Sequence, residues 1–268
     1  MVQLPKVSIS TECVESLQQY QAEIDTLSDY ASQVEKAKAI WSSRKQNQPF
    51  EEVKSKLIEM CSGARRCHYC EDSMADEMEH FRPKNLYPSQ TFVWENYLYS
   101  CGPCNGPKGD QFAIFEAATG KRIELNAPLP ASPPPGLALL INPREEDPTQ
   151  LLFLDIVAQS FVFQPWADDT NTPEFQRAQY SIDILRLNQR ADLINARKLA
   201  YGNYKARLKE YTSGKKEGIP TSQLEEMIAQ IKLEQHPSVW VEMKQERTYS
   251  NIEELQELFD LTPEALLW

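Results

Sequence analysis

The residues best suited to chemistry are gathered in three short stretches of this chain. The sequence reads CHYC at 67–70, EHFRPK at 79–84 and CGPCNGPKG at 101–109. These stretches hold four of the six cysteines and two of the three histidines. Such a cluster of thiol and imidazole groups is typical of a metal site. The spacing of the groups must then indicate which of them bind metal and which remain available for catalysis.

The cysteines form two pairs with metal-ligand spacing. Two residues separate the members of each pair, so that their thiolates can converge on one tetrahedral ion. The pairs are Cys67 with Cys70 and Cys101 with Cys104. We predict that all four bind one Zn²⁺ and that this closed set is structural rather than catalytic. His68 is an alternative ligand, whereas Cys13 and Cys61 are interpreted as packing residues. His236, in a predicted loop, is expected on the surface.

Composition limits the setting in which these groups act. The chain of 268 residues has a net charge of −11. It contains no run of about 18 apolar residues, and its N-terminus lacks the pattern of a secretory signal. We therefore expect a cytoplasmic protein without membrane association, whose cysteines stay reduced and bind metal. Because DNA-binding proteins are usually basic, a nucleic-acid role would need a local basic surface or a partner that delivers the substrate.

Polar residues lie in register with the cysteine pairs. Glu79 and His80 stand between the pairs, Asn96 precedes the second pair, and Asn105 follows the last cysteine. The strings CHYC, EHFRPK and WENYLYSCGPCNGPKGD together resemble the HNH endonucleases. This resemblance covers 67–110 and implies a ββα-metal fold, in which a hairpin and the following helix are pinned here by a zinc knuckle.

A narrower resemblance extends further along the chain. EHFRPK and SCGPCNGPKGD are similar to the PtuB-type HNH nucleases of the Septu and retron-associated antiphage systems. NPREEDP (142–148) and ILRLNQRADLINARK (184–198) also resemble that group, which extends the match over most of 64–210. The resemblance implies an effector nuclease of bacterial antiphage defence that acts with an ATPase partner.

The resemblance also implies a role for each polar residue. His80 is the general base that takes a proton from water, and Asn96 holds the loop that carries this histidine. Glu79 and Asn105 are ligands of a catalytic Mg²⁺ or Mn²⁺, because oxygen donors suit these ions. The candidate contacts to substrate phosphates are Arg82 and Lys108.

The acidic residue before the histidine departs from the usual motif. Many HNH motifs carry aspartate at the position of Glu79. The longer side chain can still reach an ion, but the nearby Asp76 and Glu77 then become alternative ligands. The sequence leaves the choice among these carboxylates open.

The rest of the sequence predicts mainly helices around this core. Apolar residues recur at helical spacing in 12–44, 49–62, 173–212, 221–233 and 250–259. The proline-rich stretch 126–149 predicts a long loop, and 151–163 predicts two short strands. We therefore predict a mainly α-helical fold around a small ββα-metal core. Its three regions are an N-terminal helical region (1–62), the nuclease core with its zinc (63–125) and a mostly helical C-terminal region (126–268).

Positive charge is concentrated in one segment of this acidic chain. Residues 176–216 contain ten basic and three acidic side chains. The segment is either a solvated helix face or a surface that contacts a phosphate backbone or a partner.

These patterns together predict a metal-dependent HNH endonuclease that hydrolyses phosphodiester bonds of DNA. The family implies products with a 5′-phosphate and a 3′-hydroxyl. Two alternatives remain open. A restriction-type HNH nuclease would be distinguished by its neighbouring genes, and a non-catalytic zinc-binding adaptor would fail to nick a plasmid in the presence of Mn²⁺.

Overall fold

The computed structural model describes residues 1–72 and 75–268, of which about half are helical, in agreement with the predicted mainly α-helical chain. The α-helices in this part are α1 (Thr11–Asp25), α2 (Tyr30–Arg44), α3 (Gln48–Glu59), α4 (Gly102–Lys108), α5 (Pro173–Ile184), α6 (Ala191–Glu217), α7 (Thr221–Lys232), α8 (Pro237–Met243), α9 (Glu246–Tyr249) and α10 (Glu253–Leu261). The strands are β1 (Glu77–His80), β2 (Tyr97–Ser100), β3 (Phe112–Glu116), β4 (Arg122–Leu125), β5 (Gly136–Ala138), β6 (Leu152–Leu154) and β7 (Phe163–Pro165). No helix within the described residues has both the length and the apolar character needed to cross a bilayer.

The strands form three small antiparallel sheets, in the orders β1–β2, β4–β3–β5 and β6–β7. In the first sheet, Glu79 pairs with Leu98 and His80 pairs with Tyr97. Helix α4 follows β2 almost directly and has a proline in its first turn, where the missing N–H leaves no helical hydrogen bond unmade. Strand β1 thus lies between the two cysteine pairs, β2 ends directly before Cys101, and α4 contains Cys104.

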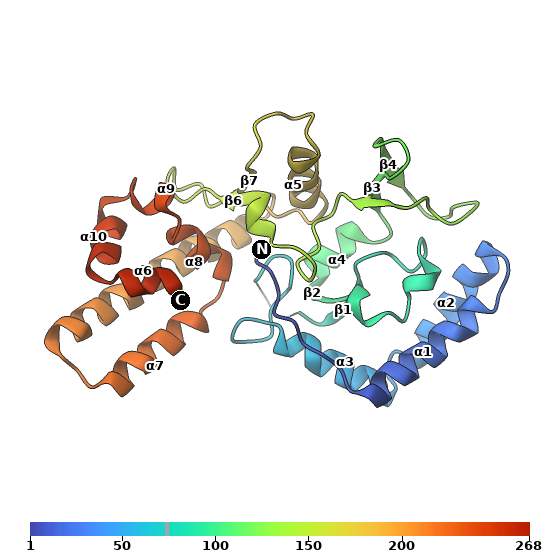
Figure 1. Ribbon diagram of the computed structural model, residues 1–268, viewed down its shortest axis with the longest axis horizontal. Coiled ribbons are helices and arrows are strands. Elements are labelled where there is room, and N and C mark those ends of the chain that lie inside the picture. The colour runs from blue at the N-terminus through green and yellow to red at the C-terminus, as the bar shows by residue number, and fades with distance from the viewer. Residues whose placement is uncertain (73–74) are drawn as a thin grey trace.

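The N-terminal helices form a wall beside the first sheet (Figure 1). The helical pattern over 12–44 is divided into two helices, because Asp29 starts a new one. Its side chain accepts a hydrogen bond of 2.8 Å from the backbone N–H of Ser32, which caps α2. Helix α3 packs against β2 through a buried face that consists of Phe50, Val53 and Leu57.

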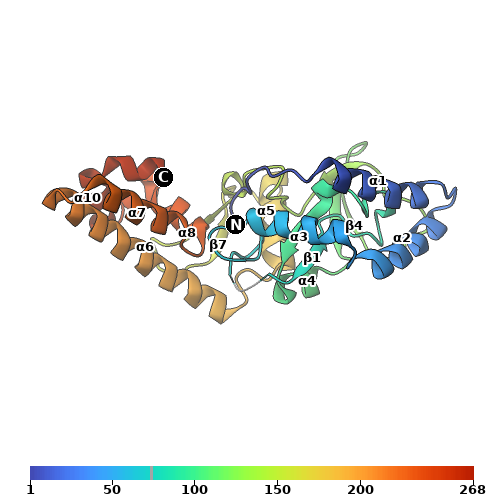
Figure 2. The same ribbon diagram turned by 90° about the horizontal axis from the view of Figure 1, so that it is seen from below.

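The C-terminal helices form the opposite end of an elongated molecule. Helix α6 runs for 27 residues and ends at Gly218, whose φ of 73° favours glycine. Helix α7 turns back beside α6, and α8 and α10 also contact α6. In the perpendicular view of Figure 2, α1 and α2 again lie at one end and α6, α7 and α10 at the other.

Charged residues from the string NPREEDP hold the middle of the molecule together. The Arg144 guanidinium donates hydrogen bonds to the carbonyls of Trp94 (2.6 Å) and Tyr97 (2.8 Å), next to and within β2. Glu146 forms an ion pair with Arg177 of α5, with a hydrogen bond of 2.8 Å. The stretch predicted as one long loop also contains β5, which pairs with β3.

Five of the ten basic side chains of 176–216 form ion pairs inside the chain. Besides the Arg177 pair, four basic side chains of α6 form ion pairs with glutamates of other elements. These pairs are Lys205 and Lys209 with Glu254, Arg207 with Glu234, and Lys215 with Glu264. The segment therefore fits the solvated, ion-paired helix face better than a phosphate-binding surface.

His236 is fully buried, so the expectation that it lies on the surface is wrong. It precedes α8 with a φ of 53°, and its Nε2 lies 3.7 Å from a carboxylate oxygen of Asp72. The start of α8 also contacts Glu71, whose carboxylate accepts hydrogen bonds from the Ser238 backbone N–H (3.1 Å) and hydroxyl (2.5 Å). This contact between residues far apart in sequence covers the imidazole.

Candidate metal centre and catalytic cleft

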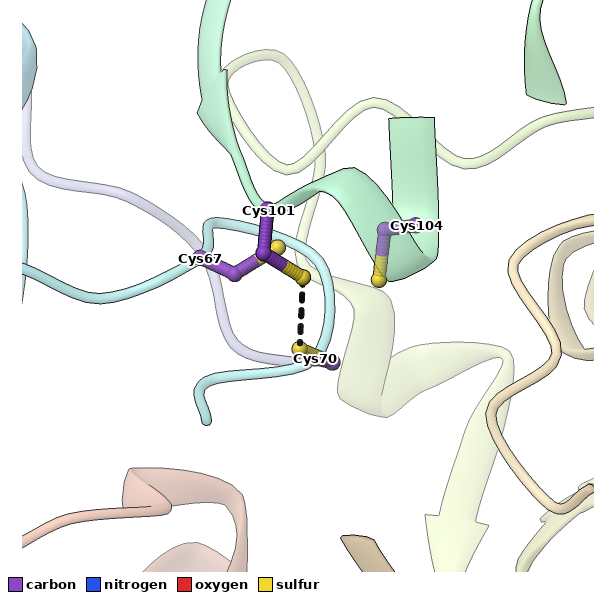
Figure 3. Close-up of side chains that lie close together, drawn as sticks. All are labelled: Cys67, Cys70, Cys101 and Cys104. Carbon is purple, nitrogen blue, oxygen red and sulfur yellow. Dashed lines mark hydrogen bonds between the residues drawn. The ribbon is translucent and has the colours of Figure 1, made fainter. Parts of the chain in front are cut away.

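The four predicted zinc ligands converge. Figure 3 shows Cys67 and Cys70 on one loop, Cys101 at the end of β2 and Cys104 on α4. All four are buried, and their sulfur atoms lie within 4.8 Å of one another. The Sγ atoms of Cys70 and Cys101 are 3.7 Å apart. A tetrahedral ion with Zn–S bonds of about 2.3 Å needs sulfurs about 3.8 Å apart. The predicted convergence is confirmed, and the set could bind zinc.

Two arginines from the C-terminal region face this cluster. The Arg190 guanidinium donates a hydrogen bond of 3.3 Å to the Cys104 sulfur. Arg197, on the first turns of α6, is fully buried, and its charge acts on the thiolates of Cys70 and Cys104. Four thiolates around Zn²⁺ carry a net charge of −2, so two cations nearby suit a loaded site. His68 points elsewhere, since its Nε2 lies 3.0 Å from the Leu57 carbonyl.

His80, the last residue of β1, is held in one orientation. Its Nε2 lies 3.0 Å from the carbonyl oxygen of Thr91. Because a carbonyl only accepts, Nε2 must carry the proton and Nδ1 must carry the lone pair. The Tyr97 hydroxyl donates to the same carbonyl at 2.7 Å, and the Trp41 ring packs on the imidazole with centroids 4.3 Å apart. Burial lowers the pKa of His80 to about 3, so the imidazole is neutral at pH 7.

Asn96 joins the two segments that flank His80. Its side-chain oxygen accepts a hydrogen bond of 2.8 Å from the backbone N–H of Arg82. Its amide donates to the carbonyls of Arg82 (3.1 Å) and Gln90 (2.8 Å). Gln90 directly precedes Thr91, whose carbonyl orients the imidazole. The amide therefore ties the segment after β1 to the segment that supplies this carbonyl.

The acidic side chains of β1 have different partners from those expected. Glu77 and Glu79 are two residues apart on one strand and so share a face. Asn105 of α4 donates a hydrogen bond of 2.5 Å to Glu77, whereas Glu79 forms a buried ion pair with Lys108. Burial raises the pKa of Glu79, and the Lys108 ammonium opposes that shift. Glu79 and Asn105 thus contact separate partners.

The two residues predicted to contact phosphates have partners within the protein, and their role toward a substrate remains a prediction. Lys108 is fully buried and also donates a hydrogen bond of 3.0 Å to the His80 carbonyl. The Arg82 guanidinium lies over the rings of Tyr87 (5.1 Å) and Phe112 (5.5 Å). Both side chains therefore support the core.

A cavity of about 980 Å³ opens beside His80, Glu77, Glu79 and Asn105. Its remaining wall comes from a region that the sequence did not connect with the site. Trp41, Lys45, Phe50, Glu51 and Lys54 of the N-terminal helices and their connection line it, together with Lys84 and Asp110. Of these, Lys84 belongs to the quoted motif EHFRPK and Asp110 ends the quoted string SCGPCNGPKGD, so both could have been found there.

A comparison with known proteins gives one local similarity. A stretch of 62 residues is 44% identical to the Septu protein PtuB of Bacillus thuringiensis and covers 21% of this chain. The match spans 23% of that relative's length, so most of both chains lies outside it. No protein-family model matches the chain.

Proposed function

We propose that this protein is a metal-dependent HNH endonuclease that hydrolyses phosphodiester bonds of DNA, and that it serves as an effector in bacterial antiphage defence together with an ATPase. The local similarity to the Septu protein PtuB supports the defence setting. The motif resemblance around residues 67–110 supports the nuclease chemistry. The similarity covers a small part of the chain, so activity and partner both need direct tests.

One observation supports the catalytic proposal most strongly. His80 is neutral, and the Thr91 carbonyl fixes its proton on Nε2. The lone pair of Nδ1 has no hydrogen-bond partner within the part of the chain that the structure describes, and the residue lines the polar cavity. A neutral imidazole with an unused lone pair is suited to take a proton from water.

The reaction follows from this geometry. His80 Nδ1 takes a proton from a water molecule in the cavity, and the resulting hydroxide attacks the phosphorus in line. The P–O bond to the 3′-oxygen breaks on the opposite side, and the leaving oxygen keeps the electron pair and takes a proton from a water molecule of the open cavity. The products are a 5′-phosphate and a 3′-hydroxyl, as the family resemblance implies. Asn96 holds both segments around the base, and Trp41 limits the rotation of its ring.

The acidic face of β1 fits a divalent cation. Carboxylates of Glu77 and Glu79 and the amide oxygen of Asn105 are donors that Mg²⁺ or Mn²⁺ accepts. When bound, such an ion would neutralise charge on the scissile phosphate and on the leaving oxygen. Lys108 already neutralises Glu79, so Glu77 and Asn105 are the donors that form no ion pair with a cation among residues 1–72 and 75–268.

Zinc at the four cysteines would have a structural role. The ligands come from the loop before β1, the end of β2 and the start of α4. One ion would therefore fix the hairpin relative to the helix that carries Asn105.

The experiment is plasmid nicking with Mg²⁺ or Mn²⁺ by the parent, His80→Ala and His80→Gln. The glutamine keeps a donor for the Thr91 carbonyl but offers no nitrogen base, which makes it a matched control for packing. Both variants should lose about 10²–10⁴-fold in rate and keep the parental zinc content; glutamine should preserve the melting temperature better than alanine, which leaves a cavity beside Trp41. Parental cleavage by either variant would contradict the role of His80.

The Lys108–Glu79 ion pair favours one rival function, a non-catalytic zinc-binding adaptor, because a cation already satisfies that carboxylate. The same assay separates the two. An adaptor would bind DNA or protein and leave the plasmid intact at every divalent-ion concentration.

A further inference from the structure

We propose that Lys45, Lys54 and Lys84 form a binding wall for the phosphate backbone of duplex DNA, so that the N-terminal helices belong to the substrate site. The sequence predicted these helices only as elements around the core. The inference rests on the proposed nuclease function, because the wall borders the same cavity as His80. It assigns the contacts to substrate phosphates to these three lysines. Neither Arg82 nor Lys108 lines the cavity.

The lysines are fixed relative to the candidate base by aromatic packing. Lys45 lies four residues after Trp41, and Lys54 lies four residues after Phe50, so each lysine is one helical turn beyond an aromatic anchor. The two anchors pack edge to face with ring centroids 5.3 Å apart, and Trp41 contacts His80. The N-terminal wall and the imidazole therefore form one packed unit.

Their charges are uncompensated by direct contacts. Among residues 1–72 and 75–268, no ammonium of these three lysines makes an ion pair or a hydrogen bond. Other lysines of α2 and α3 behave differently. Each is paired with a glutamate on the same or the neighbouring helix, namely Lys36 with Glu23, Lys38 with Glu35 and Lys56 with Glu59. Within the described part of α2, α3 and their connection, the lysines without an ion pair are the two that line the cavity, Lys45 and Lys54.

Lys84 shows the electrostatic need for an anion most directly. It is half-buried, and burial lowers the pKa of its ammonium. The carboxylates of Asp110 and Glu79 oppose that shift without forming an ion pair, and the positive charges of Lys108 and Lys45 add to it more weakly. An ammonium held at partial burial near like charges is stabilised by a phosphate, which supplies both charge and hydrogen-bond acceptors.

A polymer suits this wall better than a single nucleotide. The three lysines come from the end of α2, the middle of α3 and the segment after β1. The cavity also contains the carboxylates Glu51, Asp76, Glu77, Glu79 and Asp110. These acids repel a phosphate whether it is free or part of a polymer, so binding needs several phosphate–lysine contacts made at once, and only a polymer supplies several phosphates in one molecule.

The test measures binding without cleavage. A short fluorescein-labelled DNA duplex is titrated with His80→Ala protein by fluorescence anisotropy at several salt concentrations. In that background, Lys45→Gln/Lys54→Gln/Lys84→Gln is compared with the control Lys36→Gln/Lys38→Gln/Lys56→Gln. Both triples remove three positive charges, but only the first removes them from the cavity.

The cavity triple should lower the slope of log K against log salt by about 2 to 3, since each phosphate contact contributes about 0.9. The control triple should change the slope by less than about 1. Melting temperatures verify folding, and Lys45→Gln/Lys54→Gln replaces the triple if Lys84→Gln unfolds the chain. Equal slopes for the two triples, or no duplex binding by the His80→Ala parent even at low salt, would overturn the proposal.

The outcome is separable from that of the nuclease proposal. If the cavity triple binds DNA as tightly as the control triple and the parent enzyme cleaves DNA, the lysine wall is contradicted and the nuclease proposal stands. A cavity triple that loses binding, beside a parent that never cleaves with Mg²⁺ or Mn²⁺, keeps the wall as a DNA-binding surface and removes the nuclease.

Discussion

His80 illustrates how the environment of one side chain decides its chemistry. A histidine in water would be partly protonated near pH 6.5 and could carry its remaining proton on either nitrogen. Here burial holds the ring neutral, and the Thr91 carbonyl selects the tautomer. The same burial lowers the stability of the fold at low pH, because the imidazole binds a proton less readily in the folded protein than in the unfolded chain.

This effect of burial gives a prediction for the pH dependence of stability. The pKa of His80 is lowered to about 3 in the folded protein, against 6.5 for an ordinary histidine. Between these values the unfolded state binds more protons, so the free energy of unfolding falls as the pH falls. From pH 7 to pH 5 we expect His80 to account for about 2 kcal/mol of this loss.

Urea unfolding of the parent and of His80→Gln at pH 7 and pH 5 measures this contribution. Effects of acid on the cysteines and on other groups are shared by both proteins and cancel in the difference. The parent should lose more stability than the variant. Identical losses would mean that folding does not lower the pKa of His80.

The two acidic residues of β1 give a second prediction at the residue scale. Because Lys108 neutralises Glu79, we expect Glu77 to contribute most of the negative charge that attracts a divalent ion. Glu77→Gln should weaken Mn²⁺ binding at least about tenfold, which is about 1.4 kcal/mol. Isothermal titration calorimetry measures the affinity.

Glu51→Gln is the matched control, because Glu51 lines the same cavity but lies on α3. It removes the same charge and should change Mn²⁺ affinity much less. If the two variants lose affinity equally, the ion responds to the general field of the cavity and not to the Glu77–Asn105 pair.

At the scale of elements, the cysteine cluster joins β1, β2 and α4, and it also meets the start of α6 through Arg190. The first sheet has only two strands of four residues each, too few to be stable alone. The thiols therefore supply a constraint that the hairpin lacks. Zinc bound at the cluster would make the stability of this hairpin depend on the metal.

Cys101→Ser should abolish zinc binding and lower the free energy of unfolding by roughly several kcal/mol, because structural zinc binding contributes directly to folding. Elemental analysis should find about one zinc per chain in the parent and almost none in this variant. Cys13→Ser provides the comparison, since Cys13 bonds to the Pro49 carbonyl at 3.3 Å and lies outside the cluster. It should keep its zinc. A well-folded parent without zinc would contradict the structural role.

At the scale of the whole molecule, the net charge of −11 opposes DNA binding, and the basic side chains of α6 are largely engaged in ion pairs. Only a local wall of lysines would then attract the substrate. Such a protein depends on low ionic strength or on a partner that presents the DNA.

We therefore expect the isolated chain to cleave plasmid DNA weakly at ~150 mM salt, where the Debye length is about 8 Å, and more strongly as the salt is diluted. Addition of a cognate ATPase should restore cleavage at the higher salt. Nicking measured across a salt series, with and without the partner, tests both statements. Strong cleavage by the chain alone at ~150 mM salt would contradict the dependence on a partner.

The cysteine set and most of the helices could be predicted from the sequence, because both depend on the spacing of residues close together in the chain. Two residues between cysteines suffice to aim two thiols at one point, so the metal set was predictable. Helical periodicity located most helices, although one cap at Asp29 divided the first pattern. The division into three regions, and the roles of Glu79, His80, Asn96 and Asn105, remain predictions.

Which charged side chains can contact a ligand could be learned only from the fold, because ion pairs join residues far apart in sequence. Lys108 is buried against Glu79, four basic residues of α6 are paired with distant glutamates, and His236 is covered by α8. The same long-range packing brings Trp41 onto His80 and the unpaired lysines into the cavity. The sequence gives the number and the order of these charged groups. The free energy of ionising each one depends on its neighbours and its burial, and these depend on the fold.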